Sequence, residues 1–225
     1  MTFILVSSIA AMTASGLLIL VLERVYRDPS GSLDRLAPLP SKPVDAREMR
    51  RLFAINSVLS LALLLGIPVA AFPFLFREGP VTTPWVLLEA GSILLAYDLL
   101  YYAMHRTLHH KRLMRFIHRV HHLVRAPSAR QSMYVHPIEF TAGVVLLFLC
   151  VRLVGPVHVH AYALALVVFQ LVNVIIHSGL SFQAGPLRAL NGWARGHHGH
   201  HGVDVNRNFG QFTPVWDILF RTAIR

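Results

Sequence analysis

The chain has 225 residues, of which 54% are hydrophobic and 14% charged, and its formal net charge is +10. This composition excludes an ordinary soluble domain and predicts an integral membrane protein. The positive charge could indicate nucleic-acid binding, but the sequence shows no polar basic face and no known binding module. Basic residues flanking membrane spans explain the charge more simply, so no nucleic-acid partner is expected.

Apolar runs predict an all-α membrane fold with four to five hydrophobic helices, some of them partial or hairpin-like. About 20 residues at about 1.5 Å each cover the roughly 30 Å hydrocarbon core of a bilayer. In chain order the runs are residues 3–22, 53–76, 84–104, 138–151 and 157–176. Pro68 and Pro73 should kink the second run. The fourth run is short for a full crossing, so a partly inserted hairpin competes with two complete spans for residues 138–176.

A polar connection from Glu23 to Arg51 follows the first run. Its prolines at positions 29, 38, 40 and 43 disfavour a long helix, so a basic surface loop is expected. Residues 1–80 then hold N-terminal spans and this loop, residues 81–225 hold the chemistry, and residues 1–225 are best treated as one domain. The only cysteine, Cys150, lies in an apolar run, which excludes an intrachain disulfide and a thiolate metal cluster.

The distribution of Lys and Arg predicts the orientation in the membrane. With alternating spans, 19 of the 21 basic residues fall on one side, which the positive-inside rule makes cytoplasmic. The N-terminus is then expected on the opposite side. The same topology places most histidines on the cytoplasmic side, whereas His158 and His160 fall at the opposite turn.

Histidines recur at helical spacing. His105 and His109 are four residues apart, and two segments read H-x-x-H-H: His118, His121 and His122, and later His197, His200 and His201. Residues three and four apart share a helix face, so each segment should point its imidazoles at one place. Neutral imidazole suits iron, copper, nickel and zinc. With His177 and His136 added, nine or ten candidate ligands predict two metal ions in a cytoplasmic, histidine-rich helical region.

These segments resemble the fatty acid hydroxylase and sterol desaturase family of membrane-bound, non-haem di-iron enzymes. The resemblance covers roughly Tyr97 to Arg221. Its motifs are His105-Arg106-x-x-His109, His118-Arg119-Val120-His121-His122, His136-Pro137-x-Glu139, His177-Ser178-Gly179, His197-x-x-His200-His201, and Asn208-Phe209-Gly210 followed by Trp216-Asp217-x-x-Phe220.

The resemblance implies an enzyme with two iron ions, which zinc could replace in purified protein. It implies hydroxylation, favoured here, or desaturation of a C–H bond of a membrane lipid with O2. Electrons would come from a separate donor, either cytochrome b5-like or a ferredoxin with its reductase. Sterols, fatty acyl chains, sphingoid bases, carotenoids and ether lipids all stay open as substrates, and the oligomeric state is open too.

Carboxylates beside the histidines are also expected, because metal-bound histidines usually donate their second N–H to an acid or a carbonyl. Asp98, seven residues before His105, and Asp217 are the candidates. Glu139 could be a plain interfacial carboxylate. Four histidines are expected to lie outside the site: His110, His158, His160 and His198. Gly196 and Gly199 make the last H-x-x-H-H segment unusual for a helix.

Two other protein classes compete with the oxygenase. A metal transporter or metal-binding protein could cluster histidines, but a transporter should line a path through the spans with polar groups, and the third run offers the acids Glu89 and Asp98 alone. A di-haem cytochrome would pair single histidines across helices and would lack H-x-x-H-H segments.

Overall fold

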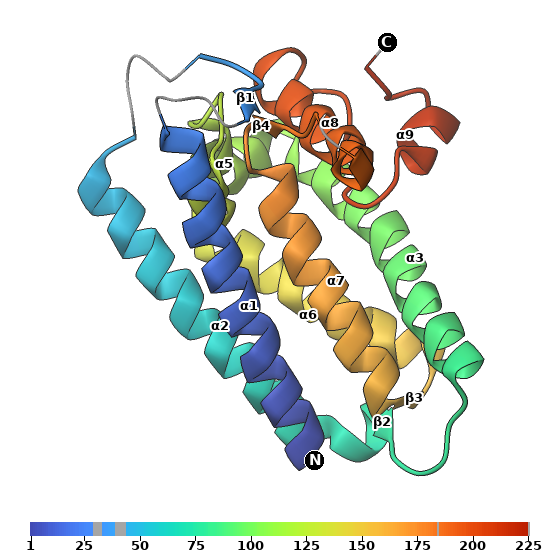
Figure 1. Ribbon diagram of the computed structural model, residues 1–225. Helices are drawn as coiled ribbons and strands as arrows, with labels where there is room; N and C mark the ends of the chain where they lie inside the picture. Colours follow the sequence, from blue (N-terminus) through green and yellow to red (C-terminus); the bar gives the residue numbers. More distant parts are fainter. Residues whose placement is uncertain (29–32, 39–43, 184, 225) are drawn as a thin grey trace.

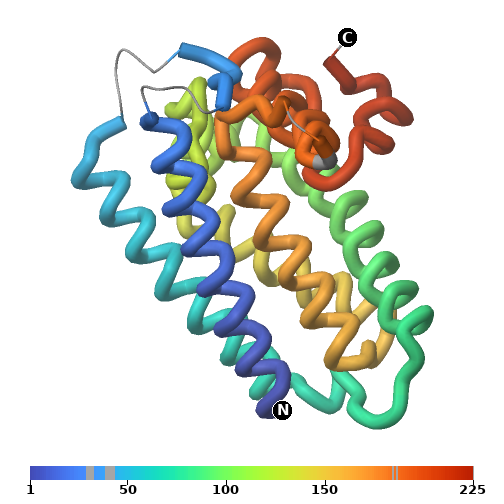
Figure 2. The backbone as a smooth tube through the Cα atoms, in the orientation of Figure 1, coloured from blue at the N-terminus to red at the C-terminus, as the bar shows by residue number. Residues whose placement is uncertain are grey.

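The computed structural model describes residues 1–28, 33–38, 44–183 and 185–224. Within these residues, five long helices run side by side and carry a layer of short helices at one end (Figure 1). The long helices are α1 (Thr2–Arg27), α2 (Ala46–Leu75), α3 (Thr83–Leu108), α6 (Pro137–Val154) and α7 (Val159–Ile176). The chain begins at the end of the bundle away from the layer and ends beside it (Figure 2). The predicted all-α class is confirmed.

The layer at the end of the bundle consists of short elements. They are α4 (Lys111–Leu113), the π-helix η1 (Met114–His118), α5 (Arg119–His122), η2 (Ala129–Met133), η3 (Gly185–Leu190), α8 (Asn191–Gly202) and α9 (Val215–Leu219). The two-residue strands β1 (Asp34–Arg35) and β4 (Leu180–Ser181) pair antiparallel in this layer. At the other end of the bundle, β2 (Phe76–Arg77) pairs parallel with β3 (Val157–His158).

The outward surface of the long helices is apolar. Leu17 and Leu20 of α1 are 59% and 68% exposed, and Val58 of α2 is 66% exposed. A soluble monomer rarely exposes so continuous an apolar surface. Each of the long helices has the length and composition of a membrane span. The chain is therefore a multi-pass membrane protein, and α6 and α7, with 18 residues each, favour two spans over a partly inserted hairpin.

Several predicted boundaries were wrong, most clearly around the first loop. The expected surface loop from Glu23 to Arg51 is too long at both ends, because α1 continues to Arg27 and α2 begins at Ala46. The carboxylate of Asp45 accepts the backbone N–H groups of Arg47 and Glu48 at 2.8 Å each, which caps the start of α2. Of the prolines in this loop, those at positions 29, 40 and 43 lie outside the described residues.

The later spans also extend beyond the predicted limits. The helix α3 continues four residues past the predicted end at position 104, and α6 includes Arg152, whose side chain is exposed. The predicted kink in α2 is confirmed: Ala71, between Pro68 and Pro73, has non-helical backbone angles (φ −121°, ψ 18°). Proline cannot donate the helical hydrogen bond and crowds the preceding turn, so the helix bends there.

In the bundle, α7 packs between α1 and α3, while α6 packs between α2 and α3. Tyr162, Leu147 and Cys150 are fully buried where these helices meet. A polar contact ties α2 to the layer: the side-chain amide of Asn56 donates to the carbonyls of Met133 and Val135 at 2.9 and 3.0 Å. The core thus fixes the helix ends from which the histidines project.

Gly179 joins α7 to the layer in a backbone conformation that favours glycine. Its φ is +66°, and a Cβ there would collide with the carbonyl oxygen of Pro127 and lie 2.8 Å from the ring of Tyr26. Gly185 has a similar φ of +52°, but a Cβ there would meet open space. Both positions carry the backbone penalty for an L-residue, and Gly179 adds steric overlap.

We predict that Gly179→Ala lowers the thermal midpoint of the detergent-solubilised protein more than Gly185→Ala does. The backbone term is about 1–2 kcal/mol for either substitution, and the overlap with Pro127 and Tyr26 applies to Gly179 alone. Thermal unfolding of both variants, followed by circular dichroism, measures the difference. Equal losses would show that the close approach at Gly179 has no energetic weight.

Candidate metal centre

The short-helix layer and the adjoining ends of α3 and α7 bring histidines together in two neighbouring groups. Among the described residues, the first group is His105, His109, His118, His122 and His200, and the second is His121, His177, His197 and His201. Within each group the ring nitrogens that could serve as ligands lie within 4.8 Å of one another. The rings of His122 and His201, one from each group, stack with centroids 4.8 Å apart, so the groups share a border.

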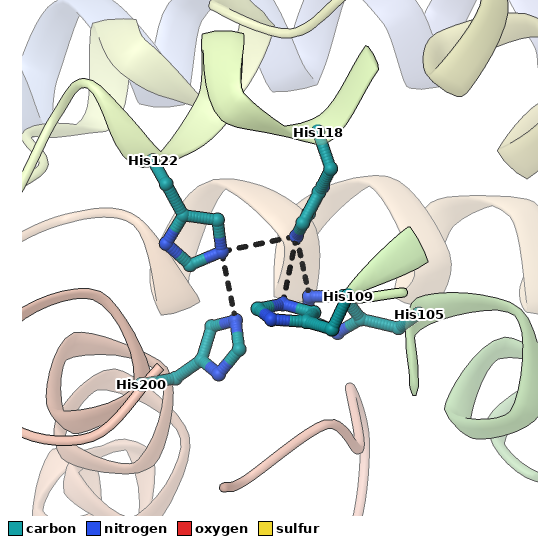
Figure 3. A group of neighbouring side chains, drawn as sticks. All are labelled: His105, His109, His118, His122 and His200. Atoms are coloured by element: carbon teal, nitrogen blue, oxygen red, sulfur yellow. Dashed lines mark hydrogen bonds between the residues drawn. The ribbon is translucent and has the colours of Figure 1, made fainter. Parts of the chain in front are cut away.

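In the first group, which we call the five-histidine group, the Nε2 atoms converge (Figure 3). The Nε2 atom of His118 lies 3.1 Å from that of His105 and 3.0 Å from those of His109 and His122. The Nε2 atom of His200 lies 3.1 Å from that of His122. The rings reach this point from the end of α3, from the η1–α5 segment and from α8.

The second group, the four-histidine group, converges in the same way. The Nε2 atom of His197 lies 2.9 Å from that of His177 and 3.1 Å from that of His201. The Nε2 atom of His121 lies 3.0 Å from that of His201 and 3.4 Å from that of His177. All four side chains are buried. His177, which follows directly after α7, therefore stands where its predicted role as a ligand requires.

Each H-x-x-H-H segment divides between the two groups, which corrects the expectation that its three rings point to one place. The residues four apart stay together: His118 and His122 in the five-histidine group, and His197 and His201 in the four-histidine group; His121 and His200 cross to the other group. Residues four apart lie one above the other on a helix, whereas the middle histidine of each segment is rotated by about 100° from the histidine that follows it. Both α5 and α8 thus serve both groups.

In several of these histidines, the second ring nitrogen, Nδ1, makes a hydrogen bond that orients the ring. The Nδ1–H groups donate to backbone carbonyls in four cases: His105 to Phe209 at 2.9 Å, His177 to Asn173 at 2.7 Å, His200 to Arg207 at 2.6 Å and His201 to Val124 at 2.7 Å. His118 donates instead to Oε1 of Glu139 at 2.8 Å. A carbonyl or carboxylate oxygen accepts only from a donor, so in these histidines the proton lies on Nδ1. The Nε2 atom then carries a free lone pair.

Facing lone pairs explain why this arrangement fits a cation. His105 and His118 both carry their proton on Nδ1, yet their Nε2 atoms lie 3.1 Å apart. Two acceptors at that distance repel each other unless a positive ion lies between them. Two nitrogens about 2.1 Å from one metal and at right angles are about 3 Å apart, which matches the measured separations. The residues present therefore suit a metal ion in each group.

Burial keeps these imidazoles neutral, as metal ligation requires. It lowers the pKa of His109 and of His177 to about 4, and that of His122 to about 3. For His121 and His197 burial is again the main cause of a pKa well below the usual value, and neighbouring histidines lower it further. The unprotonated form is thus favoured throughout the site at neutral pH.

Glu139 is the carboxylate that contacts a site histidine. Its Oε1 accepts from His118, whereas its buried Oε2 has no hydrogen-bond partner among the described residues. Glu139 is therefore more than an interfacial carboxylate. Asp217 supports the site through the backbone. Its carboxylate accepts the N–H groups of Phe209 and Gly210 at 2.8 Å each, and it thereby orients the Phe209 carbonyl that accepts the hydrogen bond of His105.

Asp98 was predicted to support a histidine ring, but the structure gives it different partners. Its buried carboxylate accepts the backbone N–H groups of Gln211, Phe212 and Thr213 and the Thr213 hydroxyl, at 2.6 to 3.1 Å. Asp98 thus anchors the loop after α8 against α3. His105 shares its helix face, as the spacing of seven predicts, but contacts the Phe209 carbonyl instead.

The remaining histidines lie outside both groups. His136, predicted as a tenth ligand, caps α6: its Nδ1 accepts the N–H of Ile138 at 3.2 Å. The off-face positions His110 and His198 are also outside the two groups, as predicted. His158 and His160 lie at the opposite end of the bundle, where His158 contacts the Gly79 carbonyl.

Sequence reasoning missed the backbone carbonyls that orient the rings, because a carbonyl has no signature in the sequence. It also missed the π-helix η1, which adds a residue to the turn before His118 and changes the direction of the rings that follow. Despite Gly196 and Gly199, α8 is a regular helix from Asn191 to Gly202. The glycine at position 199 allows the side chain of Ile224 to approach α8 closely, since a Cβ there would lie 3.0 Å from it.

The bundle and the converging imidazoles define a class: a multi-pass helical membrane protein with a two-part, histidine-lined site suited to metal ions. Comparison with known proteins identifies the family. The family model described as fatty acid hydroxylase matches residues 90–222, more than half of the chain. The chain therefore belongs to the fatty acid hydroxylase family, which includes sterol-oxidising members.

Individual relatives agree with this assignment. Methylsterol monooxygenase 1 of Danio rerio is 33% identical over 145 residues, covering 62% of this chain and 48% of that protein. Fatty acid hydroxylase domain-containing protein 2 of Homo sapiens is 29% identical over 202 residues, covering 86% and 58%. Lathosterol oxidase of Rattus norvegicus is 30% identical over 144 residues, covering 62% and 46%. The chain thus spans about half the length of these relatives. No solved structure matches it.

The pKa values predict how the metal-free protein responds to acid. As the pH falls, His109 and His177 take up protons near pH 6.5 in the unfolded chain but only near pH 4 in the folded protein. Their contribution to stability is complete above about pH 6.5 and is lost progressively as the pH falls to about 4. We predict that the thermal midpoint of metal-free protein falls over this interval, and that His109→Gln makes the fall shallower. A constant midpoint would contradict the burial of neutral imidazoles.

Proposed function

We propose that the protein is a membrane-bound di-iron oxygenase that hydroxylates, or desaturates, a C–H bond of a lipid with O2 and external electrons. The observation that carries the proposal is the convergence of nine histidine Nε2 atoms at the head of an apolar cavity within the bundle. The family and the oxidase and monooxygenase names of the relatives support an oxidative reaction.

The cavity lies beside the metal groups and inside the membrane-spanning part. Its volume is about 180 Å³, and all the long helices contribute to its wall. His121 and His177 line one end, while Met12 and Leu64 line the wall farther along the bundle. A largely apolar cavity that begins in the bilayer and ends at the metal groups suits a lipid drawn from the membrane.

Iron is the proposed metal because imidazole ligands bind it and because the proposed reaction needs a metal that activates O2. Imidazole suits zinc, copper, iron and nickel, but a closed zinc site takes four ligands, fewer than the five-histidine group offers. Two iron ions would supply O2 activation and removal of a hydrogen atom from the substrate. Zinc could occupy the same imidazoles in purified protein without supporting that chemistry.

The chain itself holds and orients the reacting partners. Carbonyls of Phe209, Arg207 and Val124 fix the rings, so that each Nε2 lone pair points into its group. Burial excludes water from the four-histidine group at the head of the cavity. In hydroxylation, the lipid C–H bond and O2 with two electrons and two protons give an alcohol and water. In desaturation, O2 with two electrons and two protons takes two hydrogen atoms from the lipid, and a C=C bond and two water molecules form. We infer that a separate cytochrome b5-like or ferredoxin-type donor supplies the electrons.

The substrate belongs to the membrane lipids, and the names of the relatives favour a sterol among them. We propose that the metal layer faces the cytoplasm and the N-terminus the opposite side. Exposed basic residues support this orientation: Arg106, Lys111, Arg112, Arg115, Arg119 and Arg125 all lie in or beside the layer.

The transporter alternative receives no support from Glu89 and Asp98, the two acids of α3. Glu89 pairs with Arg77 and accepts the backbone N–H of His158 at 2.8 Å. Asp98 is occupied by the loop at residues 211–213. Both carboxylates therefore satisfy structural contacts and do not line a polar path through the bundle.

We predict that His200→Ala and His121→Ala each lose bound iron and oxygen-dependent lipid oxidation, since they remove a ligand from the five-histidine and the four-histidine group respectively. His110→Ala, an exposed histidine outside both groups, is the matched control and should keep both properties. Metal analysis of purified protein and lipid profiling of a host expressing each variant make the measurements.

Two outcomes would overturn the proposed function, and a third would correct the membership of its site. A haem Soret band in the absorption spectrum would replace di-iron chemistry with haem chemistry. Metal analysis giving no more than one transition-metal ion per wild-type chain would exclude the two-metal site. Full lipid oxidation by His200→Ala or His121→Ala would remove that residue from the site.

A further inference from the structure

The cavity beside the metal groups contains a side chain whose hydrogen-bonding capacity is unused. Gln211 is only 5% exposed and lines the cavity together with His121 and His177. Its amide nitrogen Nε2 is buried and has no hydrogen-bond partner among the described residues. A buried amide left without a partner is costly, so its retention at the metal end of a substrate cavity requires an explanation.

The backbone of Gln211 is held firmly in place. Asp98 Oδ1 accepts the N–H of Gln211 at 3.1 Å and that of Phe212 at 2.7 Å, while Oδ2 accepts the Thr213 N–H and hydroxyl. The ring of Phe212 packs against Tyr97 with centroids 5.7 Å apart. Four charge-assisted hydrogen bonds to one buried carboxylate make this loop rigid, so Gln211 reaches the cavity from a fixed position.

A second amide in the same cavity gives a built-in comparison. Gln170 also lines the cavity, and its Nε2 also has no partner within the described chain. It precedes His177 by seven residues on α7, which places it about 10 Å deeper in the membrane. A polar atom of the substrate held by Gln170 would lie far from the metals, whereas one held by Gln211 would lie beside them.

We propose that Gln211 determines substrate specificity by donating a hydrogen bond from its side-chain amide to a hydroxyl or carbonyl oxygen of the lipid. This inference rests on the proposed function and sharpens it. The substrate then carries its oxygen at the metal end of the cavity, within a few bonds of the carbon that is oxidised, and its hydrocarbon body extends inward past Gln170. Lipids whose only polar group lies many bonds from the reacting carbon would be poor substrates.

The test measures binding rather than turnover, with probes that differ by one hydroxyl. Cholestanol and cholestane form one pair, and 1-dodecanol and dodecane form a slimmer pair. Their affinities are measured by equilibrium binding to the 225-residue protein in detergent, purified after it has been supplied with iron. A neutral hydrogen bond to a buried donor corresponds to about fivefold to tenfold in affinity. Wild-type protein should prefer the alcohol of at least one pair by this factor.

Variants of the two glutamines then locate the contact. Gln211→Met keeps the length of the side chain, removes the amide, and should abolish the preference for the alcohol. Gln170→Met makes the same change about 10 Å away and should keep the preference. Iron content is measured on every sample. If Gln211→Met fails to retain iron, Gln211→Asn replaces it, and its shorter amide should reduce the preference while the iron stays bound.

The results separate this inference from the proposed function. A full preference in Gln211→Met, or its loss in Gln170→Met, would overturn the role of Gln211 even if the protein oxidises lipids. Failure of wild-type protein to bind either pair would overturn the inference as well. If the protein binds no iron but its preference for the alcohol still depends on Gln211, the proposed oxygenase function is wrong and the hydrogen bond from Gln211 to the lipid is supported.

Discussion

Mutual repulsion among imidazole lone pairs is the constraint on which the rest of this structure depends. Backbone carbonyls and Glu139 accept hydrogen bonds from the Nδ1–H groups, so the Nε2 atoms of His105 and His118 carry no proton and face each other at 3.1 Å. Only a cation makes such a cluster favourable, and only a rigid scaffold keeps it assembled without one. The short-helix layer supplies the orienting carbonyls, and the bundle beneath supplies the rigidity.

The membrane and the metal site are built from the same helices. The helix α3 carries His105 in its last turn, and His177 follows directly after α7, so the packing of these helices against α6 and α1 sets where both histidines lie. The buried acid of α3, Asp98, holds the loop that follows α8. A single helix therefore positions a ligand, a loop and a cavity wall, which explains why polar groups are tolerated at this depth.

Much of this arrangement could be predicted from residue patterns, because both the apolar runs and the histidine spacing are periodic. The spans, the kink between Pro68 and Pro73, and the converging histidines of the three spaced segments followed from those periods, while His177 followed from its place after the last apolar run. The division of each H-x-x-H-H segment could not, since it depends on how α5 and α8 pack against each other. The roles of Asp98 and Glu139 depended on which loop or ring the fold brings within reach, and their spacing in the chain carries no such information.

The division of α5 and α8 between the groups also couples the two groups mechanically. A helix that carries histidines of both groups cannot shift to improve one set without moving the other, because His118 and His121 are three residues apart on a continuous backbone. The two groups therefore behave as one structural unit, and a substitution that displaces either helix would disturb both.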